Sequence, residues 1–236
     1  MFYLCTGLLH FTMKYPDKDT AFYLVVLTTS TVFAVLVGLM YGCVPAEGNQ
    51  RSVYFEHYMA NDSIPTLVRV DSMGFYIQSD SFIPLTRLVS DSERLVYVFC
   101  HAEEDSLGLN PGLSERGALR ARVLAGIFAD AAVGAILTPP FRRTYLSARP
   151  LAESHGVDPI LFEPEDAGSF LQLLSRAPAP LVIITTSDHL DELRTFFRLP
   201  TLAQSCYDIG YALAIDRNLE VRDVFVFRYG PTVVVH

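Results

Sequence analysis

Three short runs of the sequence carry side chains that could do chemistry, and each run follows a stretch of β-forming residues. They are FCHAEED (residues 99–105), TPPFRR (138–143) and TTSDH (185–189). Ligands of parallel sheets bind beyond the carboxyl ends of the strands, so we expect these runs to meet at one edge of a sheet. A histidine at a strand end is also a common structural residue, and its position alone leaves the role of His101 open.

Apolar runs that alternate with helical stretches predict the scaffold that holds these groups. Ser114 is a typical helix N-cap, and apolar residues after it repeat at helical spacing. The expected strands are 95–99, 134–137, 181–184, 207–215 and 224–227, with a short extended piece at 159–162. The expected helices follow Ser114 and cover 141–153, 166–174 and 190–197. In 207–215 large apolar residues alternate with small or polar ones, which predicts a strand buried on one side. The alternation of apolar runs with helical stretches favours an α/β fold, a mostly parallel sheet flanked by helices.

The chain divides into three predicted regions. Residues 1–43 are a membrane anchor or a lipoprotein-type signal, 44–93 a linker followed by a small β-rich extension, and 94–236 the α/β domain. Within the extension, Asp71–Gly74 separates two β-forming stretches, which predicts a hairpin.

Residues 21–42 contain no charged side chain. At about 1.5 Å per residue, a helix of this length spans a hydrocarbon core of roughly 30 Å. Cys43 at its end fits an acylated lipoprotein signal, and Met13 is an alternative start that would shorten the leading segment. The other interpretation is a buried core helix. Either membrane interpretation predicts a chain tethered through residues 21–42, on the extracytoplasmic face of a bacterial membrane.

Composition excludes one class of partner and limits the metal chemistry. The formal net charge is −8, which argues against a nucleic-acid surface because phosphate backbones are bound by clustered Lys and Arg. The four cysteines, Cys5, Cys43, Cys100 and Cys206, show no C-x-x-C pairing, which predicts free thiols without a disulfide framework or a zinc site. Cys100, His101, Glu103 and Glu104 lack metal-ligand spacing, so we expect no metal and no cofactor.

Residues 94–230 resemble the histidine phosphatase superfamily, the phosphoglycerate-mutase-like fold. The resemblance is carried by FCHAEED, LSERGALRARVLA (113–125), TPPFRRTYLSARPLAESHG (138–156) and LVIITTSDHLDEL (181–193), in this order and spacing. The closing segments CYDIGYALAID and VFVFRYG are similar to bacterial members.

The resemblance implies a mechanism and a set of roles. His101 is the nucleophile that becomes phosphohistidine, Arg143 holds the phosphate with Arg142 beside it, and Glu163 takes the place of the acid that protonates the leaving oxygen. The implied ligand is a phosphorylated small molecule or anion. Charge spreads over three equatorial oxygens in the transition state, so such a site needs several fixed donors and cations.

Two departures from the family pattern predict a degenerate member. The arginine that precedes the nucleophile is Cys100 here, and the second histidine aligns with Thr186. Neither a thiol nor a hydroxyl replaces a cation. His189, three residues later, is an alternative second histidine. A cysteine-phosphatase mechanism at Cys100 is disfavoured because Ser106 stands where that loop requires an arginine.

Three hypotheses follow. The first is a membrane-tethered, histidine-phosphatase-like protein with low or no phosphatase activity. The second is an active phosphomonoester hydrolase that uses His101. The third is a structural surface domain without a ligand.

Overall fold

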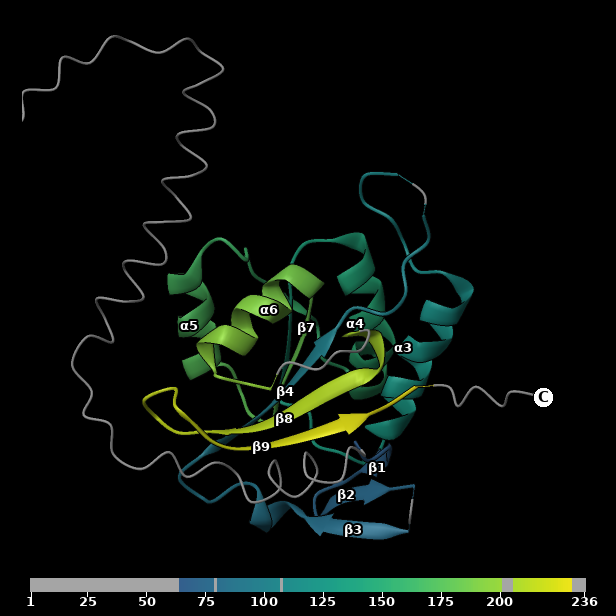
Figure 1. Ribbon diagram of the computed structural model, residues 1–236. Coiled ribbons are helices and arrows are strands. Elements are labelled where there is room, and N and C mark those ends of the chain that lie inside the picture. Colours follow the sequence, from purple (N-terminus) through teal and green to yellow (C-terminus); the bar gives the residue numbers. More distant parts are fainter. Residues whose placement is uncertain (1–63, 79, 107, 201–205, 231–236) are drawn as a thin grey trace, which may run out of the picture. The chain divides into compact units, whose positions relative to one another are not determined.

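Two β-sheets organise the residues that the computed structural model describes, 64–78, 80–106, 108–200 and 206–230 (Figure 1). The predicted anchor, including residues 21–42 and Cys43, and most of the linker lie outside these residues. Among the helices within the described ranges, none combines the length and apolar character needed to cross a bilayer.

The larger sheet has six strands in the order β6-β5-β7-β4-β8-β9. The bounds are β4 (Arg94–Cys100), β5 (Ala135–Thr138), β6 (Ile160–Leu161), β7 (Leu181–Thr185), β8 (Ile209–Ile215) and β9 (Val221–Arg228). Strands β6, β5, β7 and β4 run parallel, whereas β8 is antiparallel to both β4 and β9. The sheet is therefore mixed, and its parallel half holds all three runs that could do chemistry.

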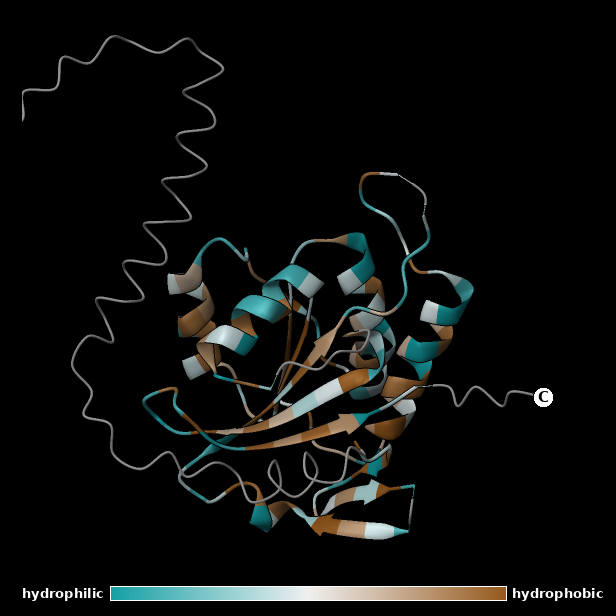
Figure 2. Ribbon diagram, viewed as in Figure 1, coloured by the Kyte–Doolittle hydropathy of each residue, from teal (hydrophilic) through white to brown (hydrophobic). Residues whose placement is uncertain are grey.

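Helices cover both faces of this sheet, as predicted (Figure 1). One face packs against α3 (Glu115–Ile127) and α4 (Arg142–His155), and the other against α5 (Ala167–Arg176) and α6 (Ser187–Phe196). Alternate residues of β4 enter the two cores, with Tyr97 on the α3/α4 side and Val98 on the α5/α6 side. The strands are accordingly the most hydrophobic part of the fold (Figure 2). Double burial explains why β4 reads as a continuous apolar run.

Local signals fix where the helices begin. The Ser114 side chain accepts a hydrogen bond from the Gly117 backbone N–H at 3.1 Å, as the sequence predicts for α3. Asp166 caps α5 in the same way, through Ser169 N–H. These caps satisfy amide donors that the first helical turn leaves without partners.

The prediction that residues 207–215 are buried on one side is wrong. Residues 206–208 form the 3₁₀ turn η2 (Cys206–Asp208), and every residue of β8 is buried. Gly210 shows the reason, because a Cβ atom there would lie 2.5 Å from the rings of Phe99 and Phe227. The small residues of β8 make room for an aromatic layer and do not face solvent.

The smaller sheet consists of β1 (Leu67–Val70), β2 (Gly74–Ile77) and β3 (Ser81–Pro84), followed by the turn η1 (Leu85–Arg87). Asp71 Oδ1 accepts from the N–H groups of Met73 and Gly74, which closes the predicted hairpin. Phe75 packs on Phe225 at 5.0 Å between ring centroids, so this sheet shares the α3/α4 core.

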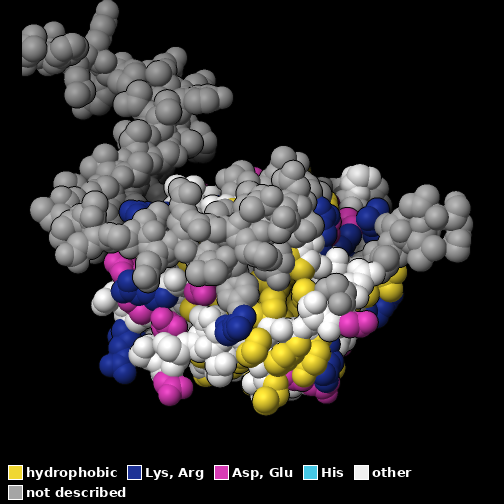
Figure 3. Space-filling model, turned by 60° about the horizontal axis from the view of Figure 1, so that its bottom comes forward, with side chains coloured by type: hydrophobic (Ala, Val, Ile, Leu, Met, Phe, Trp, Pro, Cys, Tyr) yellow, Lys and Arg dark blue, Asp and Glu magenta, His cyan; other side chains and the backbone are white. Residues whose placement is uncertain are grey.

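Some large apolar side chains of the smaller sheet remain exposed, namely Val68, Met73 and Phe82. Hydrophobic side chains gather on this side of the molecule (Figure 3).

Candidate active site at the end of strand β4

His101 directly follows β4, which lies between β7 and β8. Its backbone N–H donates to Thr185 O at 2.8 Å, so strand pairing continues through this residue. The imidazole Nδ1 lies 2.8 Å from Ala102 O. A carbonyl oxygen only accepts, so Nδ1 carries the proton and Nε2 keeps its lone pair. This tautomer leaves Nε2 as the nucleophilic atom.

The surroundings of His101 favour the neutral imidazole. Burial lowers its pKa below the ordinary value, and the Arg143 charge acts in the same direction. The hydrogen bond to Ala102 O and the charges of Glu104 and Asp188 oppose this shift without reversing it. The side chain is 3 % exposed. At neutral pH the ring is therefore uncharged and nucleophilic.

Arg143 lies in the first turn of α4 and is tied to the His101 loop through Ser147. The Ser147 hydroxyl donates to Arg143 O at 2.8 Å and accepts from Ala102 N–H at 2.8 Å. Both bonds are made by one buried oxygen. Ser147 therefore joins the segment after His101 to the first turn of α4, and the Arg143 charge acts on the imidazole.

The Arg143 guanidinium is loosely engaged. Its Nε lies 3.4 Å from Glu104 Oε2, and its central carbon lies 5.0 Å from the centre of the Phe141 ring. The Nε atom is buried and has no hydrogen-bond partner within the described ranges. Buried polar groups without a hydrogen-bond partner are rare in folded proteins, so this N–H is available to an acceptor.

Arg142 points elsewhere. Arg142 is exposed, and its backbone N–H donates to Asn110 Oδ1 at 2.9 Å. Its guanidinium carbon lies 3.4 Å from the point where a Cβ atom would stand if Gly112 had one. Arg142 thus borders the loop around residues 108–112.

Thr186 caps α6 at the end of β7. Its hydroxyl oxygen accepts from His189 N–H at 3.3 Å. The His189 ring is buried between Phe162 and Phe170, each at 5.3 Å, and its Nδ1 lies 2.8 Å from Thr185 Oγ1. Burial lowers the pKa of His189 to about 4. None of the contacts described for His189 involves His101 or Arg143.

Glu163, the predicted acid, is exposed in the loop after β6. Its backbone carbonyl accepts from Asp166 N–H. No contact within the described part of the chain joins its carboxylate to His101. The carboxylates whose charges act on His101 are those of Glu104 and Asp188.

The prediction of free thiols is wrong for two of the four cysteines. Cys100, the last residue of β4, forms a disulfide with Cys206, the first residue of η2, with 5.7 Å between their Cα atoms. The residue that precedes the candidate nucleophile is therefore half of a disulfide. The next residue along, Tyr207, lies 5.5 Å from His101 between ring centroids.

Sequence reasoning missed four participants: Glu104, Asp188, Tyr207 and the pairing partner Cys206. Glu104 and Asp188 belong to the runs that were recognised, so their proximity to the strand ends was the available signal.

Glu103 is different, because Arg120 donates to both of its oxygens at 2.6 and 2.8 Å. Burial opposes ionisation of Glu103, yet these bonds hold its pKa below the ordinary value. The Glu103–Arg120 pair is a structural ion pair.

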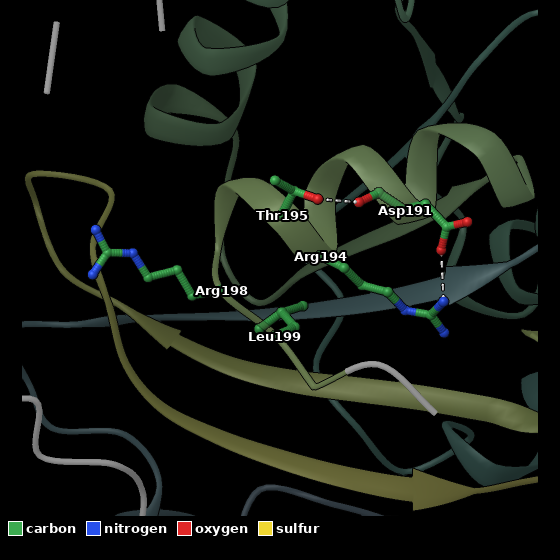
Figure 4. Close-up of a pocket in the computed structure, with 5 residues that line it drawn as sticks. All are labelled: Asp191, Arg194, Thr195, Arg198 and Leu199. Carbon is green, nitrogen blue, oxygen red and sulfur yellow. Dashed lines mark hydrogen bonds and ion pairs between the residues drawn. The ribbon is translucent and has the colours of Figure 1, made fainter. Parts of the chain in front are cut away.

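A separate pocket of ≈ 370 Å³ lies at the other end of α6 (Figure 4). It is lined by Asp191, Arg194, Thr195, Arg198 and Leu199. Arg194 donates to Asp191 at 2.7 Å and to the Tyr211 hydroxyl at 2.9 Å. This pocket brings no imidazole or thiol to a ligand. In the part of the chain that the structure describes, no group of three or more His, Cys, Asp or Glu side chains could hold a metal ion.

Comparisons with known proteins support the architecture. No protein-family model matches the chain, and no curated protein matches it. Among solved structures, mycobacterial hydrolase 1 superimposes with a TM-score of 0.51 at 14% identity, covering 59% of this chain and 100% of that one. Mycobacterial hydrolase 2 gives 0.51 at 13% identity, covering 61% and 94%.

The protein histidine phosphatase SixA, solved with tungstate, is a third match, with a TM-score of 0.48 at 11% identity over 57% of this chain and 96% of that one. Identities this low show the fold alone, and the first two matches, each with a TM-score of 0.51, are the ones that support it. The helices on both faces of the sheet and the position of His101 after β4 agree with the predicted architecture, whereas the sheet is mixed. The described domain shares its fold, a mixed sheet with helices on both faces, with mycobacterial hydrolases 1 and 2.

Proposed function

We propose that this protein binds a phosphorylated small molecule or anion at the end of β4 and hydrolyses phosphate esters slowly or not at all. The single observation behind this proposal is the small amount of positive charge beside His101. Arg143 is the cation whose charge acts on the imidazole, and Glu104 Oε2 lies 3.4 Å from Arg143 Nε.

The two departures in sequence support low activity. Cys100 is bonded to Cys206 and offers no donor, and the Thr186 hydroxyl, whose oxygen accepts the amide of His189, can donate one hydrogen bond but carries no charge. Loss of one preorganised donor costs about 10²- to 10³-fold in rate, and two losses act on the same transition state, although such effects need not multiply.

The test is hydrolysis of a generic aryl phosphate by the purified chain, with His101→Ala as the matched control. We expect a rate far below that of a complete site, together with binding of inorganic phosphate that Arg143→Ala weakens. Equal phosphate binding by wild type and Arg143→Ala would contradict the proposal.

The second candidate function is slow phosphomonoester hydrolysis through His101. The Nε2 lone pair favours it. In this reaction Nε2 attacks phosphorus, the P–O bond to the leaving group breaks, and a carboxylic acid protonates the departing oxygen; water then hydrolyses the phosphohistidine. Glu104 is better situated than Glu163 to be that acid in its protonated form, since Glu104 is one of the two carboxylates that act electrostatically on His101. A phosphohistidine trapped on His101 and detected by mass spectrometry would support this candidate, and equal rates for wild type and His101→Ala would reject it. If both candidates fail, a structural surface domain remains.

We further propose an extracytoplasmic, membrane-anchored location. The uncharged segment 21–42 supports an anchor, and the Cys100–Cys206 disulfide is typical of proteins outside the reducing cytoplasm. Release of the intact protein from membranes by high salt without detergent would count against this proposal.

A further inference from the structure

The Cys100–Cys206 disulfide joins two pairs of neighbouring residues. Cys100 immediately precedes His101, and Cys206 immediately precedes Tyr207, although the two cysteines are separated by 106 positions. The covalent bond therefore fixes the segment that carries Tyr207 against the segment that carries the imidazole. This pairing sets the position of an aromatic side chain at the candidate site.

Tyr207 lies over His101 and within the electrostatic range of the other site groups. Its ring is inclined by 58° to the imidazole, with 5.5 Å between centroids. Burial raises the pKa of the Tyr207 phenol, the charges of Glu104 and Glu103 raise it further, and Arg143 opposes them. Together with the 3 % exposure of His101, these contacts place Tyr207 as part of the cover of the imidazole.

Tyr207 is held from both sides along the chain. On one side is the disulfide at Cys206. On the other, Asp208 O accepts from Tyr229 N–H at 2.9 Å, and Asp208 Oδ2 accepts from Arg228 at 2.9 Å. Of these two anchors, the disulfide is the one that a chemical reaction can remove while the rest of the fold keeps its hydrogen bonds.

We propose that Tyr207 is a cover over His101 that the Cys100–Cys206 disulfide holds closed, and that reduction of this disulfide opens the site to a phosphorylated ligand. The part of this inference that concerns the ligand rests on the proposed function, whereas the covering of His101 does not.

The chemical step is a thiol–disulfide exchange with an external dithiol. The attacking thiolate breaks the S–S bond, a mixed disulfide forms, and the second thiol of the reagent resolves it. Cys100 and Cys206 together gain two electrons and two protons, and the dithiol becomes a disulfide. Cys206 is a partly exposed residue and Cys100 is 1 % exposed, so the reagent approaches the disulfide from the Cys206 side.

The experiment measures the reactivity of the imidazole itself. The full chain is treated with diethyl pyrocarbonate, which acylates accessible neutral histidines, and the modification rate of each histidine is read by peptide mass spectrometry. One sample is oxidised, and the other is reduced with dithiothreitol and then desalted without air. A covered group reacts only through its minor open state, which is typically 0.1–10% populated, so we expect His101 to react about tenfold faster or more after reduction.

Variants separate the cover from its anchor. Cys206→Ser should react fast without reductant and show no further response to it. Tyr207→Ala should react fast in both states, whereas Tyr207→Phe, which keeps the ring, should behave like wild type. Cys43→Ser leaves both disulfide cysteines in place and is the matched control. His189, which is 5 % exposed, should stay protected throughout and reports that the fold is intact.

Equal His101 rates in the oxidised and reduced wild type would overturn the proposal, as would an unchanged rate in Tyr207→Ala with His189 still protected. Phosphate binding is measured on the same samples. If His101 opens on reduction and phosphate binds in neither state, the proposed function fails and the cover stands. If phosphate binds equally well in both states and His101 rates do not differ, the cover fails and the proposed function stands.

Discussion

The neighbouring strands β4 and β7 end beside different histidines, and the two environments differ. His101 follows β4 with Nδ1 fixed on a backbone carbonyl and the charges of Arg143 and Glu104 acting on it. His189 lies one helical turn beyond β7, with its ring between two phenylalanines and Nδ1 on Thr185. Both rings are buried, yet only His101 has both a cation that lowers its pKa, Arg143, and carboxylates that raise it, Glu104 and Asp188. Burial and position at a strand end are thus shared by a candidate nucleophile and by a core residue, and the charges around the ring separate them.

The largest expected effect comes from adding a cation at the end of β4 and an imidazole directly after β7. The triple variant Cys100→Arg, Thr186→His, Cys206→Ser introduces the arginine and the second histidine that the resemblance implies and removes the cysteine that would lose its partner. Two donors worth about 10²- to 10³-fold each should raise kcat/KM on an aryl phosphate by on the order of 10³-fold or more over Cys206→Ser alone.

The control for this prediction is thermal unfolding, because an arginine in place of the buried Cys100 could disrupt packing. A folded triple variant that gains neither turnover nor phosphate affinity would show that the site has been assigned to the wrong residues.

The next effect is the dependence of stability on pH at the β7 end. The folded pKa of His189 is about 4, below the ordinary value of 6.5. The unfolded chain therefore binds the proton first as pH falls, so the stability that neutral His189 contributes is present above pH 6.5 and is lost as pH falls toward 4. Between pH 7 and 4.5 this loss is on the order of 2 to 3 kcal/mol.

Urea unfolding at both pH values checks this prediction. The control is His189→Gln, which cannot titrate, and its loss of stability should be smaller by that amount. Parallel pH profiles for the two proteins would mean that the His189 environment is not as dry as the structure indicates.

A smaller effect is expected at the cap of α6. Thr186→Ala removes the oxygen that accepts His189 N–H and should lower the free energy of unfolding by about 1 kcal/mol. Thr186→Ser keeps the oxygen and should restore most of the loss. Chemical denaturation measures both. If serine and alanine are equivalent, the Thr186 oxygen does not serve as a cap and is free to face a ligand.

The smallest effect concerns the titration of His101 itself. Glu104→Gln removes a charge that raises the His101 pKa and should lower that pKa, whereas Arg143→Gln should raise it. Titration of the His101 ring by NMR gives both directions. Shifts of the same sign in the two variants would be incompatible with the charges around His101.

Local patterns carried much of the fold prediction. The apolar runs at β4, β5 and β7, the Ser114 cap and the Asp71–Gly74 turn each depend on residues close in sequence, and the structure has them as predicted. The meeting of His101 with Arg143 also followed, because parallel strands bring their carboxyl ends to one edge.

The errors lie in features that depend on distant partners. The burial of β8 is decided by Phe99 and Phe227, which no pattern within residues 209–215 reports. The bond between Cys100 and Cys206 joins positions that share no spacing motif, so composition alone favoured free thiols. The same holds for Tyr207, which is far from His101 in sequence and lies 5.5 Å from it between ring centroids.

The Ser147 hydroxyl has a consequence for any ligand that binds at this edge. One oxygen accepts the Ala102 amide and donates to the Arg143 carbonyl, so the imidazole loop and the first turn of α4 are already joined when the chain has folded. A small anion therefore does not have to draw two separate elements together. The entropy cost of binding is then limited to the immobilisation of the anion itself. Even a site poor in positive charge can retain affinity under such preorganisation.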